Sequence, residues 1–249
     1  MPDAGTRRAY PPATFADPTP YGYLYAGFKV DPPRRAPVVR RSRIRDEAIA
    51  HLSALADRFD ELPQVVKATV FRAVFMPPIP DAPRFDVALL IRTTSPEALG
   101  DVQASEPYAQ LGADSVITAY NSRRIGATEP FAPDVAGRDT DTFESSSYLF
   151  NHFAASDPDQ ATAAWESLNG WYLTKTGVDN STLLRPHNST PYAVINYVRL
   201  PGRTLPFLLN QLIRPTFTTF VRATLRRNGL AALPAFFTPV SNSTSSNSS

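Results

Sequence analysis

The sequence contains no cysteine, only three histidines and only three lysines. The missing cysteine excludes disulfide bonds, thiolate catalysis and cysteine-ligated metal sites. A multi-histidine metal site is not expected either, because His51 falls on an expected helix, His152 on an expected strand and His187 in an expected turn. Arginine supplies nearly all the positive charge, and we attribute this preference for arginine over lysine to the base composition of the gene rather than to nucleic-acid binding.

Long apolar runs are also missing. No stretch approaches the roughly 18 apolar residues of a membrane span, and residues 1–20 lack the apolar core of a signal peptide. We therefore expect a cytoplasmic protein without a membrane or nucleic-acid partner. Asn-x-Ser/Thr sequons, among them those at Asn180, Asn188 and Asn242, would matter only in a secreted chain. The motifs GxxxxGK, GxGxxG and GxSxG do not occur in a context that supports phosphate-loop, dinucleotide or serine-hydrolase folds.

What the chain does contain is an internal repeat. The stretch "YLYAGF", residues 23–28, matches "YLFNHF", residues 148–153, and "FDVALLIR", residues 85–92, matches "YAVINYVR", residues 192–199. The offset is 125 in the first match and 107 in the second. One insertion in the first half explains the difference, and the arginine-rich segment 31–45 is the candidate.

Each half then predicts the order strand, helix, strand, strand, helix, strand. β-Branched and aromatic content between turn residues places the strands at 22–29, 66–76, 85–93 and 115–123, then at 146–154, 181–185, 192–200 and 234–240. The first helix of the second half begins after an N-cap at Asp157 and ends at Gly177. A later helix near 205–213 breaks at Pro215 and resumes.

A βαββαβ half is the ferredoxin-like arrangement. Because of this order in both halves, and of "SPEALGDVQASEPYAQL" at residues 95–111, the chain resembles the dimeric α/β-barrel superfamily, which includes antibiotic-biosynthesis monooxygenases, polyketide cyclases and EthD-like proteins. The resemblance implies an α+β fold with two fused units whose sheets pack as a barrel, and ligands held within the barrel or between a sheet and its helices. We expect a flexible N-terminal arm at 1–20, units at 21–125 and 146–240, a linker at 126–145 and a disordered tail at 241–249.

Strand alternation predicts which side chains face the barrel. It directs Tyr148, Phe150, His152 and Tyr197 inward, where His152 and Tyr197 are expected to meet, and it also directs Asp86 and Ala193 inward. It directs Asn151 and Asn196 together beneath the helices, along with Phe85 and Tyr192. For the two asparagines we favour a structural amide pair, with a ligand-facing pair as the alternative. Gly27 stands at the place equivalent to His152 and is expected to leave space there.

These side chains permit acid–base chemistry in the barrel. His152 is the candidate acid or base, and Tyr197 the candidate hydrogen-bond donor to an oxyanion. A packing role for His152 is the alternative. The candidate substrate-binding residues are Tyr23, Tyr25, Asp86, Arg92, Tyr148, Phe150, Arg199, Asn151, Asn196 and Trp165. For Asp86 the alternative is an ion pair with an arginine. Trp165 is expected in the core first, with a place in the wall of the pocket as the alternative.

The expected function is cofactor-free cyclisation, isomerisation or oxygenation of an apolar, ring-containing substrate of polyketide or aromatic metabolism. The alternatives are a non-catalytic small-molecule binding protein and a haem enzyme resembling chlorite dismutases. We expect a monomer or a homodimer. The arginine-rich insertion is interpreted as a solvated loop, with binding of nucleic acid or of an acidic partner as the alternative; its arginines are Arg34, Arg35, Arg40, Arg41, Arg43 and Arg45.

Overall fold

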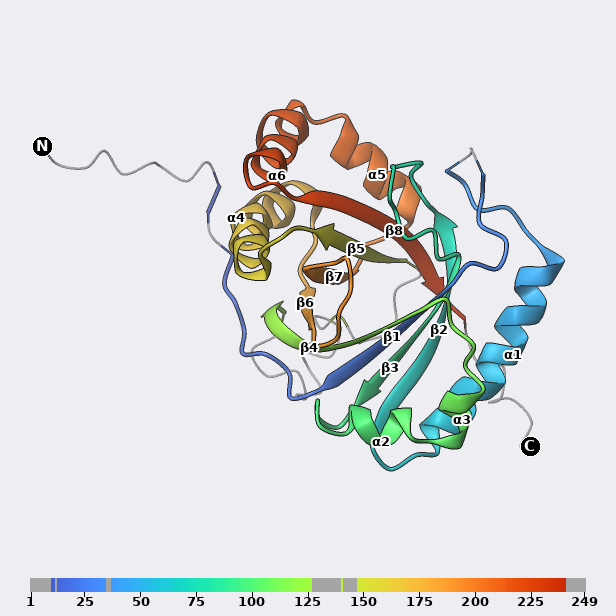
Figure 1. Ribbon diagram of the computed structural model, residues 1–249. Helices are drawn as coiled ribbons and strands as arrows, with labels where there is room; N and C mark the ends of the chain where they lie inside the picture. Colours follow the sequence, from blue (N-terminus) through green and yellow to red (C-terminus); the bar gives the residue numbers. More distant parts are fainter. Residues whose placement is uncertain (1–9, 12, 35–36, 127–139, 141–146, 241–249) are drawn as a thin grey trace, which may run out of the picture.

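The computed structural model describes residues 10, 11, 13–34, 37–126, 140 and 147–240. Eight strands close into one antiparallel barrel in the order β1-β3-β2-β8-β5-β7-β6-β4 (Figure 1). The strands are β1 (Gly22–Phe28), β2 (Val65–Phe75), β3 (Val87–Thr93), β4 (Ser115–Ile125), β5 (Tyr148–Ala154), β6 (Ser181–Pro186), β7 (Val194–Arg199) and β8 (Ala231–Pro239). All eight predicted strands are therefore present.

The barrel consists of two equivalent halves, as the repeat predicts. In the first half β1 lies between β3 and β4, and in the second half β5 lies between β7 and β8. The halves are joined by antiparallel pairing of β2 with β8 and of β4 with β6. Closure leaves no free sheet edge, so every strand is paired on both sides. The predicted α+β fold with two ferredoxin-like units forming an α/β barrel is confirmed.

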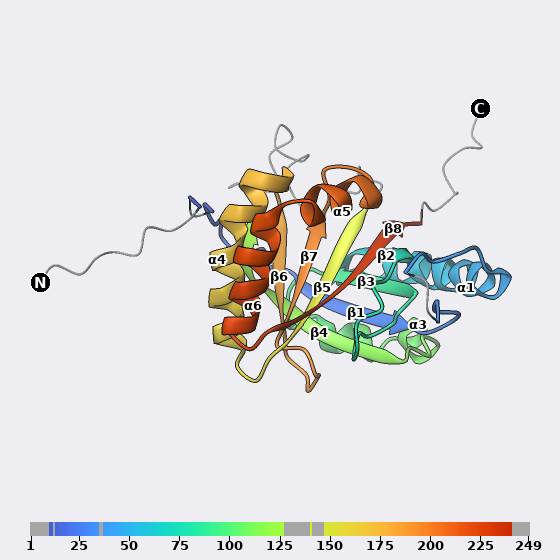
Figure 2. The same cartoon turned by 90° about the horizontal axis from the view of Figure 1, so that it is seen from above.

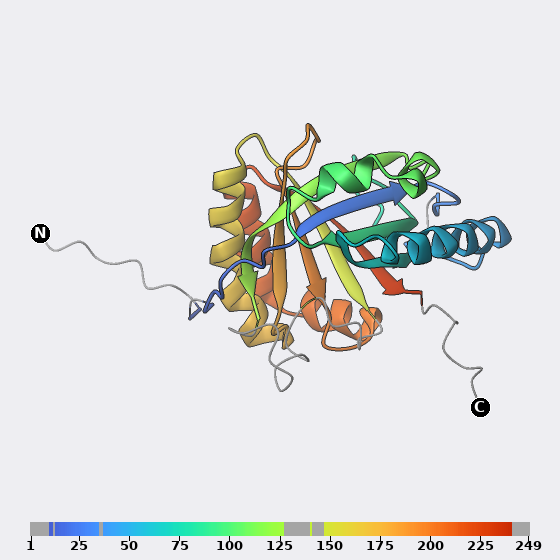
Figure 3. The ribbon, with the colours of Figure 1, turned by 90° about the horizontal axis from the view of Figure 1, so that it is seen from below.

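Helices cover the outer face of each half (Figures 1 and 3). In the first half they are α1 (Arg43–Asp60), α2 (Leu99–Gln103) and α3 (Glu106–Ala109). In the second half they are α4 (Pro158–Thr176), α5 (Thr204–Leu212), the π-helical turn η2 (Phe217–Arg222) and α6 (Ala223–Arg227). The α4 boundaries agree with the prediction, because the side chain of Asp157 accepts a hydrogen bond from the Asp159 amide and Gly177 takes the left-handed conformation at φ 74°.

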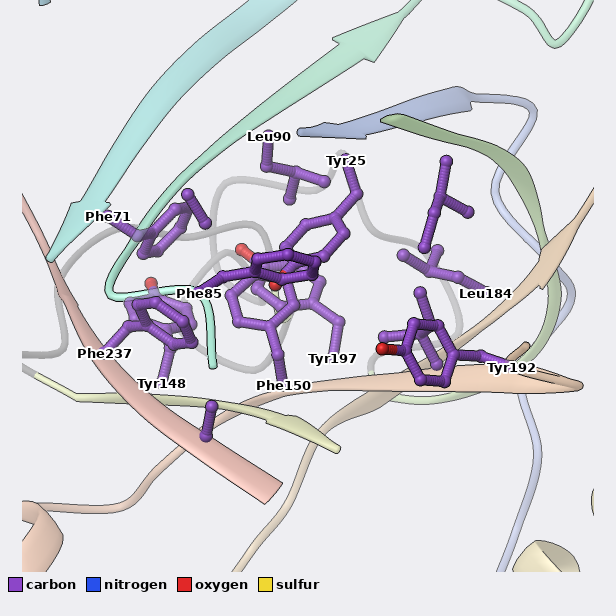
Figure 4. Packing of buried hydrophobic residues seen from close by; sticks show 14 of the residues in the cluster. Tyr25, Phe71, Phe85, Leu90, Tyr148, Phe150, Leu184, Tyr192, Tyr197 and Phe237 are labelled. Carbon is purple, nitrogen blue, oxygen red and sulfur yellow. The ribbon is translucent and has the colours of Figure 1, made fainter. Parts of the chain in front are cut away.

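The barrel interior is an aromatic core (Figure 4). Rings from both halves interdigitate there, and none of those on the strands is more than 1 % exposed. Its aromatic members, here called the interior cluster, are Tyr23, Tyr25, Phe71, Phe85, Tyr148, Phe150, Tyr192, Tyr197 and Phe237. Because rings offer large apolar area, this cluster holds the two halves together.

Alternation predicts the inward and outward sides correctly within the strands, but it fails just before β3 and β7. Phe85 and Tyr192 were expected beneath the helices and instead join the interior cluster. Asp86 and Ala193 were expected in the barrel and instead lie outside it, Asp86 against Arg45 and Ala193 among the residues that pack under α4. The regular pleat starts only at Val87 and Val194, so residues ahead of it need not alternate.

A flexible arm was expected at the N-terminus, but the described part of this segment packs on both halves, on β4 of the first and on α4 and η2 of the second. Ala16 forms an antiparallel bridge with Arg124, and the Tyr10 ring lies 4.9 Å from that of Phe220. The main chain at Pro11 contacts α4 so closely that a Cβ on Gly170 would lie 2.1 Å from its carbonyl oxygen. Most of the predicted linker and the whole predicted tail lie outside the described residues.

No helix in the described part of the chain is long and apolar enough to cross a membrane.

Candidate active site

His152 lies on β5 and points into the barrel, where it is fully buried. Its ring is surrounded by aromatic neighbours from three other segments, with centroids 5.4 Å from Tyr25, 6.5 Å from Phe85 and 4.8 Å from Tyr192. Its Nδ1 lies 3.3 Å from the Leu233 carbonyl oxygen on β8. If Nδ1 carries the proton, Nε2 is the free acceptor, and Nε2 has no hydrogen-bond partner among the described residues.

Burial controls the charge of this histidine. Removal from water lowers the pKa of His152 from 6.5 to about 4, although the bond to the Leu233 carbonyl acts in the opposite direction. The imidazole is therefore neutral at neutral pH. Burial also raises the pKa of the Tyr25 hydroxyl far above its usual value, with a smaller contribution from Tyr192. Tyr25 therefore remains a protonated donor, and its hydroxyl too has no partner among the described residues.

The interior leaves little of the expected space around His152. A Cβ on Gly27 would lie 2.3 Å from Cδ2 of Phe85, so the Phe85 ring fills the gap that the glycine provides. Tyr197 was expected to meet His152, but it pairs in register with Phe150 and stacks on that ring at 4.9 Å. A second stacked contact, at 5.7 Å, joins Tyr197 to Tyr148 (Figure 4).

Two other predicted binding residues have structural partners. Asp86 is fully buried and accepts hydrogen bonds from the Val30 and Asp31 amides and from Nε of Arg45, at 2.6 Å. The ion-pair alternative thus describes Asp86, and Arg45 is the one member of the arginine-rich segment that is buried in the described part of it. Trp165 is a residue of α4 and packs in the core of the second half, where its ring lies 5.8 Å from the Phe15 ring.

The remaining predicted residues lie near the ends of the barrel. The Arg92 guanidinium stacks over the Tyr21 ring at 4.9 Å, and Arg199 lies 3.6 Å from a carboxylate oxygen of Asp179. The Tyr23 hydroxyl lies 3.1 Å from Oγ1 of Thr19. These contacts fix the side chains in place.

A large pocket lies on the other side of the same strands. It has a volume of about 1110 Å³ and is enclosed between β5–β8 and the helices α4, α5, η2 and α6, with Phe75, Pro77 and Ile79 of the first half at one edge. Figure 2 shows these helices standing over the second-half strands. We call it the helix-side pocket. Its walls are mainly apolar, and its volume slightly exceeds the usual range for small-molecule sites, which extends to about 1000 Å³.

Asn151 and Asn196 meet in the wall of this pocket. They are register partners across β5 and β7, as predicted, and both line the cavity. Oδ1 of Asn196 accepts a hydrogen bond from Oγ of Ser181 at 2.5 Å. Oδ1 of Asn151 is buried and has no partner among the described residues. The ligand-facing alternative thus describes Asn151 better than a closed amide pair does.

Asn169 is a pocket residue that the sequence analysis missed. It lies on α4, lines the pocket and is 5 % exposed, and its Nδ2 has no partner among the described residues. An unpaired amide acceptor on the sheet and an unpaired amide donor on the helix are therefore both present in one apolar cavity. Asn169 directly follows Leu168, which belongs with Trp165 and Tyr172 to the apolar stripe of this helix. A polar amide beside an apolar stripe is the sequence feature that could have identified Asn169 as a pocket residue.

Metal ions and haem require particular ligand side chains in a site. The described residues contain no group of three or more histidine, cysteine, aspartate or glutamate side chains that would hold a metal ion. The described lining of the helix-side pocket has no histidine, cysteine or methionine for haem iron, and Tyr172 is its one phenol. His152 lies outside this lining. The pocket therefore does not fit the histidine-ligated haem that the superfamily resemblance offered as an alternative.

No protein-family model and no curated protein matches the sequence. Among solved structures, the chain is similar to an anthrone oxidase-like protein, with a TM-score of 0.62, 12 % identity, and coverage of 92 % of this chain and 94 % of that one. It is also similar to a candidate chlorite dismutase, with a TM-score of 0.52, 8 % identity, and coverage of 89 % and 94 %. Both likenesses are to the fold, that of the α/β barrel.

Proposed function

We propose that the protein is an oxygenase that acts on an apolar, ring-containing substrate in the helix-side pocket and needs no cofactor. The observation that carries the proposal is the pair of buried, unpaired amide atoms, Oδ1 of Asn151 and Nδ2 of Asn169, in a mainly apolar cavity. A buried polar atom without a partner costs about 1–3 kcal/mol. A substrate that bonds both atoms recovers this cost, so the pocket favours a ring system whose oxygen substituents donate a hydrogen bond to Asn151 and accept one from Asn169, and a single enol hydroxyl can do both.

The fold likeness suggests anthrone as the probe for this pocket. Anthrone has one carbonyl, enolises to a phenol and reacts with dioxygen. In the reaction anthrone + O₂ → anthraquinone + H₂O, one oxygen atom forms the new carbonyl, and the other leaves as water with the two methylene hydrogens. Asn151 would accept the hydrogen bond of the enol hydroxyl, and the dry pocket would hold the ring for attack by oxygen.

The test is aerobic turnover of anthrone, followed by anthraquinone absorbance and by ¹⁸O incorporation from ¹⁸O₂. We expect Asn151→Leu and Asn169→Leu each to reduce kcat/KM by about tenfold or more, because each removes one hydrogen bond to the substrate. Asn188→Leu is the matched amide control, since Asn188 is exposed in the β6–β7 connection, bonds Thr118 and does not belong to the described lining of the pocket. Quinone formation no faster than in buffer, with anthrone bound, would contradict the proposal.

A non-catalytic binding protein is the second candidate, and one observation favours it. The described lining of the helix-side pocket contains no carboxylate and no imidazole, so the pocket has no ordinary general base. An easily enolised substrate needs none, whereas most others do. Tight anthrone binding without turnover would establish this second candidate.

A further inference from the structure

Helix α5 exposes an apolar ridge. Leu205, Leu209, Leu212 and Ile213 have exposed fractions of 61 %, 54 %, 60 % and 74 %, whereas Phe207 and Leu208 on the opposite side of α5 are buried. The exposed residues recur at the spacing of one helix face. Burial in a core explains Phe207 and Leu208, but four large apolar side chains in water on one short helix need another explanation.

The charged residues of the chain segment that carries this ridge are all of one sign. The sequence contains no aspartate or glutamate after Asp179. Arg203 precedes α5 and Arg214 follows it, and exposed arginines continue along η2 and α6 at Arg222, Arg226 and Arg227. None of these five arginines forms an ion pair within the described part of the chain. Arg214 is half-buried and donates a hydrogen bond to Asn210, whereas the other four are exposed, so their charges are available to a partner.

The ridge adjoins the mouth of the helix-side pocket. Leu212 belongs to both, because it is 60 % exposed and also lines the pocket. Arg222 and Arg226 line the same pocket from η2 and α6 and are themselves exposed. Figures 1 and 2 show α5 on the outside of the barrel beside α6. One surface therefore combines an apolar ridge, unpaired arginines and the entrance to an apolar cavity.

From this combination we propose that the α5 ridge docks on an anionic lipid surface. An apolar helix face inserts at the boundary between headgroups and acyl chains, and flanking arginines contact the lipid phosphates. Their aliphatic stems can lie along the apolar layer while the guanidinium groups reach the headgroups. The docked pocket mouth then faces the layer where apolar ring compounds accumulate, so substrate enters without crossing water. Binding of α5 to a membrane surface does not require a helix that crosses the membrane. It does depart from the expectation that the protein has no membrane partner.

A second copy of the chain is the main rival occupant. Two ridges facing each other would bury the leucines, but they would also bring five unpaired arginines of each copy together without a described acidic residue from α5 onward to compensate. Like charges at an interface oppose association. The charge pattern therefore favours a negatively charged surface over a second copy.

The test is sedimentation of the full chain with vesicles of phosphatidylcholine containing 30 % phosphatidylserine, and with pure phosphatidylcholine. We expect binding to the anionic vesicles that weakens by about tenfold from low to high salt. Leu205→Ser/Leu209→Ser should weaken it by about tenfold or more, and Arg203→Gln/Arg227→Gln should weaken it on anionic vesicles alone. Neither pair contains a pocket residue, so anthrone binding in solution should be unchanged.

Matched controls are available on the opposite half. Ile44→Ser removes an apolar side chain that is 63 % exposed on α1, and Arg41→Gln/Arg43→Gln removes two exposed arginines from the arginine-rich segment. Both should leave vesicle binding unchanged. No vesicle binding, or equal loss in these controls, would overturn the proposal, and so would a wild-type dimer in analytical ultracentrifugation that Leu205→Ser/Leu209→Ser converts to monomer without any lipid effect.

Discussion

The Phe85 ring occupies the space beside Gly27 that a side chain on β1 would need. A Cβ built on Gly27 lies 2.3 Å from Cδ2 and 2.4 Å from Cγ of Phe85. The ring is also held by Tyr25 at 6.3 Å and by His152 at 6.5 Å. Gly27 is thus required for its small size, because it admits an aromatic ring into the barrel at the position equivalent to His152.

This relationship predicts that Gly27→Ala destabilises the protein. The contact atoms are near the base of the ring, so Phe85 cannot avoid the methyl group by rotating its end. We expect a loss of about 1–3 kcal/mol in the free energy of unfolding, measured by urea denaturation. Gly100→Ala is the control, because nothing lies within 4 Å of its Cβ and α2 favours alanine. If both variants unfold at the same urea concentration as the wild type, Phe85 does not fill this space.

A second prediction concerns the buried ion pair of Arg45 and Asp86. Their side chains are 3 % and 0 % exposed and lie 2.6 Å apart. Arg45→Met would leave a buried carboxylate with only backbone donors, and we expect it to cost about 3–5 kcal/mol. Arg43→Gln breaks the exposed pair with Glu47 and should cost less than about 1 kcal/mol. Comparable losses in thermal unfolding would contradict this view of Asp86 as a structural anchor.

The sequence predicted the fold well because the fold repeats a local pattern. The eight strands, the cap at Asp157 and the Gly177 terminus follow from local chemistry. The β5–β7 register of Asn151 with Asn196 follows from strand alternation together with the ferredoxin-like topology. The break at Pro215 was also predicted, although the chain resumes as a π-helical turn rather than an α-helix. The strand positions, the helix ends and the helix break depend on residues that are close in the sequence, and a residue pattern contains this local information.

The candidate site was predicted less well because it depends on where strands begin and on how helices are spaced. Phe85 and Tyr192 precede the first residues of β3 and β7, so their inward direction follows from the loops and not from alternation. Together they fill the space near His152 that was expected to hold a substrate. The helix-side pocket exists because α5, η2 and α6 stand away from the strands, and no local pattern in the sequence specifies that separation.

A third prediction follows from the lowered pKa of His152. Between pH 6.5 and about 4 the unfolded chain binds a proton at this residue that the folded chain does not, so the contribution to stability is present above pH 6.5 and is lost as pH falls toward 4. The full loss amounts to about 3 kcal/mol. His152→Phe, which suits the aromatic surroundings, should flatten this part of the profile in denaturation from pH 4 to 7.

The same variant tests the catalytic role expected for His152. The imidazole lies inside the barrel and does not line the helix-side pocket. If His152 acts only in packing, His152→Phe should retain anthrone turnover within about twofold while its stability profile changes. If the folded variant loses turnover, and the pH dependence of its remaining turnover differs from that of the wild type, His152 has the predicted acid–base role.

The last prediction separates stability from function in the helix-side pocket. Oδ1 of Asn151 is buried without a partner in the described structure, so the empty protein carries its desolvation cost. Asn151→Leu has a similar shape and should leave the free energy of unfolding unchanged or raise it by about 1–2 kcal/mol. Asn196→Leu is the comparison, because it breaks the bond from Ser181 and should destabilise by about 1 kcal/mol or more.

The two asparagines are neighbours on paired strands. If the two substitutions change the free energy of unfolding in opposite directions, the difference comes from hydrogen bonding and not from position. A loss of stability in Asn151→Leu as large as in Asn196→Leu would show that the Asn151 amide is a structural group, and the proposed substrate contact would then lose its main support.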